Sequence, residues 1–88
     1  MYDVEFLPEA AEDLAQLDKA IAQRVLRKLR WLAENLDSLR PEPLSGSFSG
    51  LMKLRVGDYR IIYQVDHERN ALTIYLVGHR REIYEQLP

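Results

Sequence analysis

One predicted hairpin constrains the fold more than any other part of the sequence. Apolar and polar side chains alternate before and after a Gly57-Asp58 pair. Alternation with a period of two is typical of strands with one buried face, and a Gly-Asp pair suits the two-residue turn of a β-hairpin. We therefore expect antiparallel strands over 51–56 and 59–65, with Arg55 directly opposite Arg60. A shift of one residue would send every apolar side chain to the wrong face, so the pattern specifies this register.

The two faces of this hairpin differ in chemistry. The face expected to cover the helices is apolar and carries Met52, Leu54, Val56, Tyr59, Ile61 and Tyr63. The opposite face carries the cations Lys53, Arg55 and Arg60, together with Ile62 and Gln64. Like charges facing each other are unfavourable in a sheet. The cationic face is therefore either a solvated surface or a site for an anion, and the leading candidate is a nucleic-acid phosphate, which arginine grips through two hydrogen bonds.

The rest of the chain predicts two helices and two further strands. Residues 2–7 alternate like a half-buried strand, and Pro8 suits the first turn of the helix that follows. Apolar residues then recur every three or four positions, which predicts a second, amphipathic helix over 19–36. Residues 37–50 are rich in Pro, Gly and Ser and are expected to form a loop. Residues 71–78 are β-branched and aromatic, as in a strand.

The order of these elements is β-α-α-β-β-β, which predicts an α+β fold. Its simplest form is an antiparallel sheet with the two N-terminal helices on one face, which leaves the other face open to solvent or ligand. A chain of 88 residues without a repeat or linker makes one domain, 1–88. It has no cysteine, no signal-peptide pattern and no apolar run of membrane-spanning length. We therefore expect a cytoplasmic protein without membrane contacts.

Charge is segregated along the N-terminal half of the chain. Residues 1–18 hold six carboxylates and no cation, whereas residues 19–30 hold five cations and no carboxylate. The simplest expectation is that the two blocks face each other and neutralise. The alternative is that they form separate charged patches on the surface.

The residues around the cationic face allow one kind of phosphate chemistry. The last strand ends in Gly78-His79-Arg80-Arg81, and the sequence shows no metal-ligand spacing and no Gly-rich phosphate loop. Cations can hold a phosphodiester and stabilise the charge that develops on it, while a histidine or tyrosine moves a proton. Because RNA brings its own nucleophile, the 2′-hydroxyl, such a set suffices to cleave RNA without a metal.

Four segments closely resemble the RelE/ParE superfamily of toxins from bacterial and archaeal toxin–antitoxin systems. They are FLPEAAEDLAQL (6–17), PLSG (43–46), KLRVGDYRIIYQVD (53–66) and VGHRREIY (77–84). The resemblance implies the compact microbial-ribonuclease-like fold of that superfamily. RelE-like members cut mRNA in the ribosomal decoding site without a metal, whereas ParE-like members poison DNA gyrase. It also implies a cognate antitoxin that wraps around the toxin. A non-toxic domain that only binds the antitoxin is a third alternative.

The resemblance also implies roles for individual residues. Arg60 and Arg80 match arginines that bind and stabilise the scissile phosphate, and Lys53 matches a catalytic lysine. Tyr84 matches a tyrosine that orients or deprotonates the 2′-hydroxyl. Three more side chains are expected to assist in phosphate or RNA binding, namely Arg55, His79 and Arg81. The preferred prediction is a ribosome-dependent mRNA endonuclease without cofactors. Leu51 departs from this pattern because some RelE members have a second lysine there, and a net charge of −2 is unusual for these basic toxins.

Three ring-bearing side chains have open roles. His79, whose unperturbed pKa is about 6.5, suits either proton donation to the leaving 5′-oxygen or a packing role at the end of its strand. Trp31 lies off the apolar stripe of its helix and is expected at the edge of the core or in contact with the antitoxin. Tyr75 would share the open face if Leu76 and its apolar neighbours pack against the helices.

Overall fold

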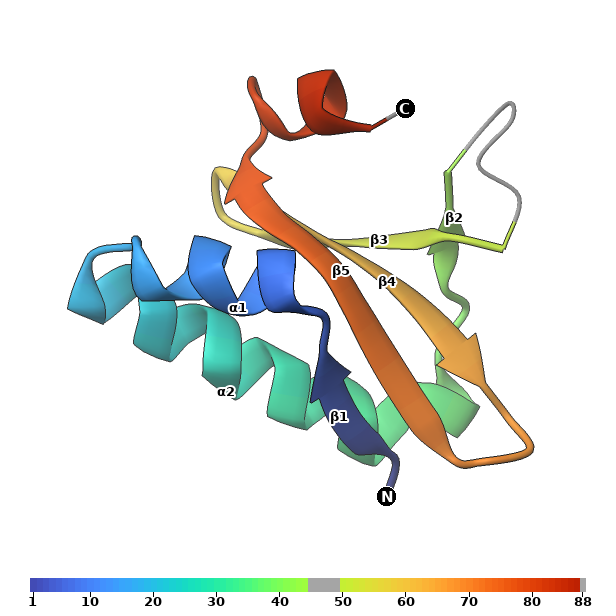
Figure 1. The fold of residues 1–88 in the computed structure, drawn as a ribbon. Helices are drawn as coiled ribbons and strands as arrows, with labels where there is room; N and C mark the ends of the chain where they lie inside the picture. Colours follow the sequence, from blue (N-terminus) through green and yellow to red (C-terminus); the bar gives the residue numbers. More distant parts are fainter. Residues whose placement is uncertain (45–49, 88) are drawn as a thin grey trace.

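The computed structural model describes residues 1–44 and 50–87 and shows an α+β fold, a five-stranded sheet with two helices on one face (Figure 1). The helices are α1, Pro8–Ala15, and α2, Lys19–Asn35. The strands are β1, Asp3–Phe6; β2, Glu42–Pro43; β3, Met52–Val56; β4, Tyr59–Asp66; and β5, Ala71–His79. Short 3₁₀ helices follow α2 and β5, namely η1, Leu36–Ser38, and η2, Ile83–Gln86. No helix within the described residues has the length and hydropathy needed to cross a membrane.

The sheet is mixed, so the prediction of a purely antiparallel sheet is wrong. The strand order is β1-β5-β4-β3-β2, and β1 runs parallel to β5 with Asp3 beside Ala71. The chain leaves β1, covers one face with α1 and α2, and re-enters the sheet at the opposite edge. That return adds the unpredicted strand β2, where Glu42 pairs with Lys53 inside the segment expected to be a loop. Residues 45–49 of that segment lie outside the described part of the chain.

The hairpin of β3 and β4 has the predicted register, with Arg55 opposite Arg60. Gly57 has a φ of +58°, as the first central position of a type II′ turn requires, and glycine adopts this conformation without strain. The backbone N–H of Arg80 donates to the carbonyl of Asp58 at 2.8 Å. The turn is therefore bonded to the segment that follows β5.

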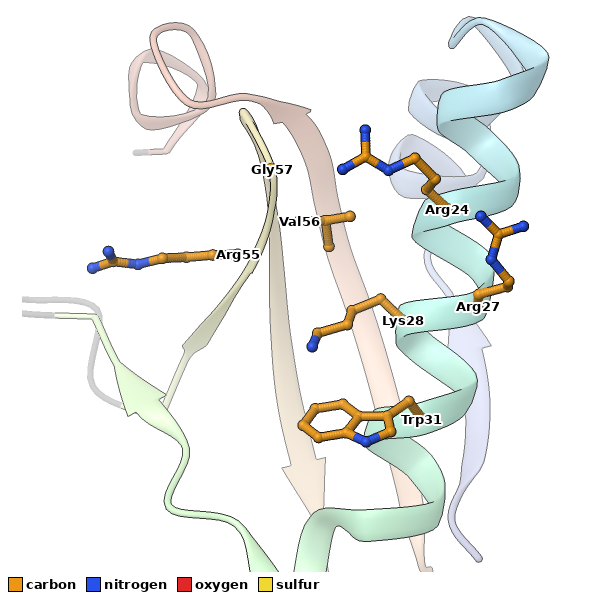
Figure 2. Close-up of a pocket in the computed structure, with 7 residues that line it drawn as sticks. All are labelled: Arg24, Arg27, Lys28, Trp31, Arg55, Val56 and Gly57. Carbon is orange, nitrogen blue, oxygen red and sulfur yellow. The ribbon is translucent and has the colours of Figure 1, made fainter.

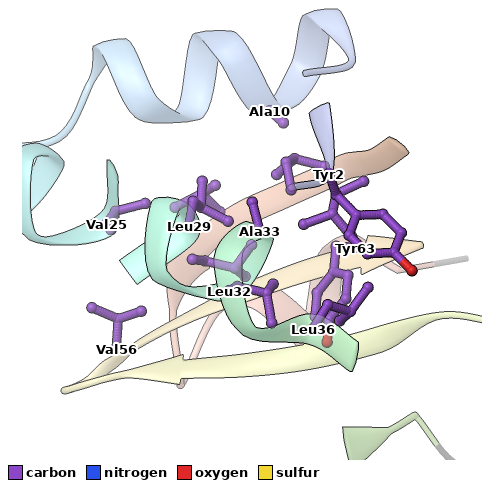
Figure 3. Packing of buried hydrophobic residues seen from close by; sticks show 13 residues of the cluster. Tyr2, Ala10, Val25, Leu29, Leu32, Ala33, Leu36, Val56 and Tyr63 are labelled. Carbon is purple, nitrogen blue, oxygen red and sulfur yellow. The ribbon is translucent and has the colours of Figure 1, made fainter. Parts of the chain in front are cut away.

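The main core lies between α2 and the sheet (Figure 3). The apolar stripe of the helix supplies Val25, Leu29 and Leu32, and Leu36 of η1 continues it; all four are buried. The predicted apolar face of the hairpin is confirmed for Met52, Leu54, Val56, Ile61 and Tyr63, which belong to this cluster or pack against it. Tyr59, also predicted on this face, is not among the residues of this cluster or those packed against it, and its ring meets that of His79 edge-on at 5.6 Å.

The other face of the sheet is partly covered, which corrects the expectation of an open face. Ile62 and Leu76 are buried there beneath Ile83 of η2. An irregularity in β5 places Leu76 on this face, because Ile62 pairs with Leu76 whereas Tyr63 pairs with Ile74. One extra residue, Tyr75, therefore sits between the two pairs.

This extra residue changes the sorting of side chains along β5. Ile74 packs in the main core, but Leu76 packs on the opposite face, so the inward position predicted for Leu76 is wrong. Tyr75 lies on the side away from the helices, as expected, and its hydroxyl donates to Oε1 of Gln64 at 3.0 Å.

The acidic and basic N-terminal blocks form no ion pairs with each other among the described residues, so direct pairing does not provide the expected neutralisation. Two carboxylates of the first block have partners in the sheet or the turn beside it instead. Glu5 pairs with Arg69 at 2.7 Å, and Oδ2 of Asp13 accepts a hydrogen bond from the backbone N–H of Val77 at 3.1 Å. The cations of α2 are left to form a surface of their own.

Candidate functional site

The predicted site residues gather at the end of the sheet that carries the Gly57-Asp58 turn. Lys53 and Arg55 lie on β3, Arg60 on β4, His79 at the end of β5, Arg80 and Arg81 in the turn after it, and Tyr84 on η2. Arg60 pairs with Gly78, one residue before His79. We call this group of seven residues the cationic end.

Ile83 positions Tyr84 beside Lys53. The side chain of Ile83 is fully buried, and a Cβ placed on Gly78 would lie 3.5 Å from it, so η2 packs directly on the backbone of β5. The next residue, Tyr84, is 43% exposed. The Lys53 Nζ lies 5.9 Å from the centre of the Tyr84 ring, close to the outer limit of a cation–π contact. A buried apolar anchor thus places an exposed phenol next to an ammonium group.

Glu42 belongs to the site although sequence reasoning missed it. Its Oε2 atom lies 3.3 Å from the Nζ of Lys53 and 2.9 Å from Nη2 of Arg55. Hydrogen bonding from Arg55, followed by the contact with Lys53, lowers the pKa of Glu42 even though desolvation opposes the shift. Glu42 stands between two prolines in a segment that looks like a loop. Only the pairing of β2 with β3 reveals that it faces the cations.

Replacing Arg55 with glutamine is expected to raise the pKa of Glu42 back toward that of an ordinary glutamate. Because the native pKa is lowered, the ion pairs are fully formed above the unfolded value and are lost as the pH falls through the native one. An NMR titration of the Glu42 side-chain carboxyl carbon measures this shift. Arg69→Gln, which removes an equally exposed arginine from Glu5, is the matched control. A Glu42 pKa that stays low in Arg55→Gln would contradict the assignment.

The two facing arginines have separate partners, which relieves their repulsion. Arg55 binds Glu42, whereas Nη1 of Arg60 donates to the carbonyl oxygens of Gly57 and Tyr59, each at 2.9 Å. A guanidinium has five N–H donors, and both of these bonds use one nitrogen of Arg60. The turn therefore orients this guanidinium without occupying all of its donors.

Arg80 is held more loosely than Arg60. Its Nε lies 3.7 Å from Oδ1 of Asp58, and its side chain is 50% exposed. Ion pairs of this length and exposure contribute little to stability. The side chain of Arg80 is therefore accessible to an anion, while its backbone N–H ties it to the hairpin turn.

His79 makes a packing contact and a backbone contact. Its ring lies edge-on to Tyr59, and its Nδ1 accepts a hydrogen bond from the backbone N–H of Arg81 at 3.2 Å. When Nδ1 accepts, the neutral imidazole carries its proton on Nε2. These contacts fit the packing role, and proton donation by His79 stays a prediction. Arg81 itself is exposed.

The cationic end has the chemistry of an anion site with one phenol beside it. Across residues 1–44 and 50–87, no cluster of three His, Asp or Glu side chains is placed to hold a metal ion. Arginine and lysine side chains come from two neighbouring strands, β3 and β4, and from the turn after β5, and Tyr84 offers a hydroxyl beside Lys53. Side chains of this kind can bind an anion such as phosphate.

Proteins of known structure share this architecture. The chain superposes on the crystal structure of the toxin–antitoxin complex RelBE2 from Mycobacterium tuberculosis with a TM-score of 0.80 and 30% identity, over 90% of this chain and 98% of that one. A putative RelE-like toxin of Escherichia coli is 32% identical over 90% of this chain and 83% of that protein. Toxin RelG of M. tuberculosis is 31% identical over 97% of this chain and 98% of its own length.

The helix-backed sheet, together with these relatives and the family model, identifies the protein as the toxin component of a type II toxin–antitoxin system. The model of the ParE toxin family, from the type II system parDE, matches residues 4–84, and the chain belongs to that family. The predicted RelE/ParE resemblance is confirmed. The relatives carry Rel names, whereas the family model carries a ParE name. The choice between mRNA and DNA gyrase as the target therefore depends on the chemistry of the site.

Proposed function

We propose that this toxin is a metal-free mRNA endonuclease that cuts translated message on the ribosome and is neutralised by a cognate antitoxin. The observation that carries the proposal is the position of Tyr84 beside Lys53 at the end of the sheet that also holds Arg60 and Arg80. A protein that only binds gyrase needs no phenol placed among phosphate-binding cations. Cleavage of a phosphodiester needs both.

The proposed reaction uses the 2′-hydroxyl of the RNA as its nucleophile. Arg60 and Arg80 hold the nonbridging oxygens of the scissile phosphate, and Tyr84, acting as the phenolate, orients the 2′-hydroxyl and takes its proton. The 2′-oxygen forms a bond to phosphorus as the bond to the 5′-oxygen breaks. The products are a 2′,3′-cyclic phosphate and a 5′-hydroxyl, whose proton comes from water or from Nε2 of His79 in its protonated, imidazolium form. Lys53 stabilises the negative charge on the phenol and the phosphate.

Substrate binding exchanges one anion for another. Glu42 pairs with Lys53 and Arg55 in the structure, and the phosphate of the bound RNA replaces it. The exchange keeps the cations paired before and after binding, so neither state leaves like charges facing each other without a counter-ion. Arg55 and Arg81 contribute to the attraction of the RNA rather than to the bond-breaking step.

Primer extension on a translated reporter mRNA tests the proposal. When the chain is induced without an antitoxin, we expect new 5′ ends within the codons of the message. The same message without its start codon is the control and stays intact, because cleavage requires the ribosome. Intact mRNA together with accumulated gyrase–DNA complexes would favour the gyrase alternative. Harmless expression together with tight antitoxin binding would leave only the non-toxic alternative.

A further inference from the structure

A second cationic surface lies between α2 and the end of β3. There a cleft of about 460 Å³ opens beside Val56 and Gly57. Its helical wall carries Arg24, Arg27, Lys28 and Trp31. Figure 2 shows Lys28 and Trp31 reaching from α2 toward the strand, while the side chain of Arg55 points away from the helix. The helix, rather than the cationic end, therefore supplies the charge of this cleft.

The charge of the cleft is not compensated locally. Arg24, Lys28 and Trp31 are spaced by four and three residues and so share one face of the helix. No carboxylate of the described residues lines the cleft, and like charges four residues apart weaken a helix. The Nζ of Lys28 lies 3.9 Å from the centre of the Trp31 ring, close enough for a cation–π contact that holds the ammonium at the cleft.

The cleft is continuous with the proposed active site. A neighbouring cavity of about 250 Å³ shares Lys28, Trp31 and Arg55 with it and extends to Glu42 and Lys53. A ligand that follows this surface passes around the outer edge of the sheet, from α2 to the ion pairs of Glu42. Because the two cavities adjoin, one extended polyanion can contact both cationic surfaces.

We propose that this cleft binds the phosphate backbone of a structured RNA, as a second contact apart from the cleaved strand. The proposal rests on the proposed function in its choice of RNA as the polyanion. Three cations beside a tryptophan that is 39% exposed form the combination of charge and aromatic surface that nucleic-acid interfaces use. Arginine also matches the geometry of phosphate.

The composition of the cleft favours RNA over an acidic protein segment. Protein interfaces depend on apolar anchors. Of the described residues that line the cleft, only Trp31 and Val56 have large apolar side chains. The exposed leucine of α2, Leu26, lies in a different groove together with Met1. The apolar and the cationic surfaces of α2 are therefore separate, and the cationic one has the chemistry of a phosphate contact.

Binding of a fluorescein-labelled RNA hairpin tests the proposal, with anisotropy measured at several salt concentrations. The parent in this experiment is the full chain with Arg80→Ala, so that cleavage of the RNA does not interfere with the binding measurement. Both double variants are made in this parent. Arg24→Gln/Arg27→Gln changes the cleft, and Lys19→Gln/Arg30→Gln removes the same charge from elsewhere on α2. We expect the cleft variant to bind about tenfold more weakly, with a salt slope that falls by roughly 1 for each phosphate it no longer neutralises. The control variant should bind within about twofold of the parent.

The outcomes separate this proposal from the proposed function. Equal effects of the two double variants, or no effect of the cleft variant, would overturn the RNA contact. Unchanged hairpin binding together with weaker binding of the antitoxin would also overturn it and assign the cleft to a protein. Loss of hairpin binding supports the cleft even if message in cells is never cut. Thermal unfolding of both variants checks that each is folded.

Discussion

Cells that express Arg80→Ala without an antitoxin are expected to grow normally, whereas cells that express the parent toxin stop growing. Under the proposed function, Arg80 stabilises charge that develops on the scissile phosphate. Removal of one preorganised donor of this kind slows a reaction by about 100- to 1000-fold. The fold should survive, because the Arg80 side chain is half-exposed and its bond to the hairpin turn uses the backbone N–H.

Growth curves, primer extension and thermal unfolding together measure this effect. Arg69→Ala is the matched control, since Arg69 is also an exposed arginine in an ion pair but follows β4 at the opposite end of the hairpin. It should arrest growth like the parent. Full cleavage by Arg80→Ala would remove Arg80 from the site. A large loss of stability would show that its role is structural, because exposed substitutions normally change stability by about 0.5 kcal/mol or less.

Ile83→Ala is expected to lower both stability and cleavage. Ile83 is fully buried between η2 and the sheet, and truncation of a buried isoleucine to alanine costs about 2–5 kcal/mol. The lost packing energy weakens the contact that holds η2 against β5. Because Tyr84 is the next residue in η2, we expect cleavage by Ile83→Ala to fall toward that of Tyr84→Ala.

Urea unfolding and primer extension separate the two effects of this substitution. Ile83→Val keeps most of the contact and is expected to cost about 0.5–1.5 kcal/mol and to retain cleavage. Tyr84→Phe removes the hydroxyl without disturbing the anchor, so it should lose cleavage but keep the free energy of unfolding. Full cleavage by Ile83→Ala would show that the proposed reaction does not depend on the position of η2.

Local pattern predicted the parts of the fold that depend on neighbours in the chain. Alternation around the Gly57-Asp58 turn specified which residues of β3 and β4 face each other, and the apolar period specified α2 almost to its ends. It could not predict the partner of β1, because the choice of sheet edge depends on the path of the chain through both helices. The extra residue in β5 was also missed, because nothing near Tyr75 marks an irregularity.

The candidate site was predictable only in part. The cations of the hairpin followed from alternation, whereas Arg80 and Tyr84 received their roles from a family resemblance. The role of Glu42 could not be predicted, because the proline-rich segment around it shows no strand periodicity. Its contact with Lys53 depends on a strand of two residues. The covered face of Ile62 was missed for a similar reason, since Ile83 lies in a short 3₁₀ segment with no sequence signature.

The carboxylate of Glu42 competes with any anionic ligand for Lys53 and Arg55. It is attached to the same chain as Lys53 and Arg55, so its effective concentration at these cations is set by the chain and does not fall on dilution. A mononucleotide or inorganic phosphate must displace it with a single charge. An RNA strand that is already bound nearby competes with Glu42 more effectively. Its next phosphate is also tethered and therefore has a high local concentration at Lys53 and Arg55. Under the proposed function, we therefore expect the resting ion pairs to favour polymers over small anions.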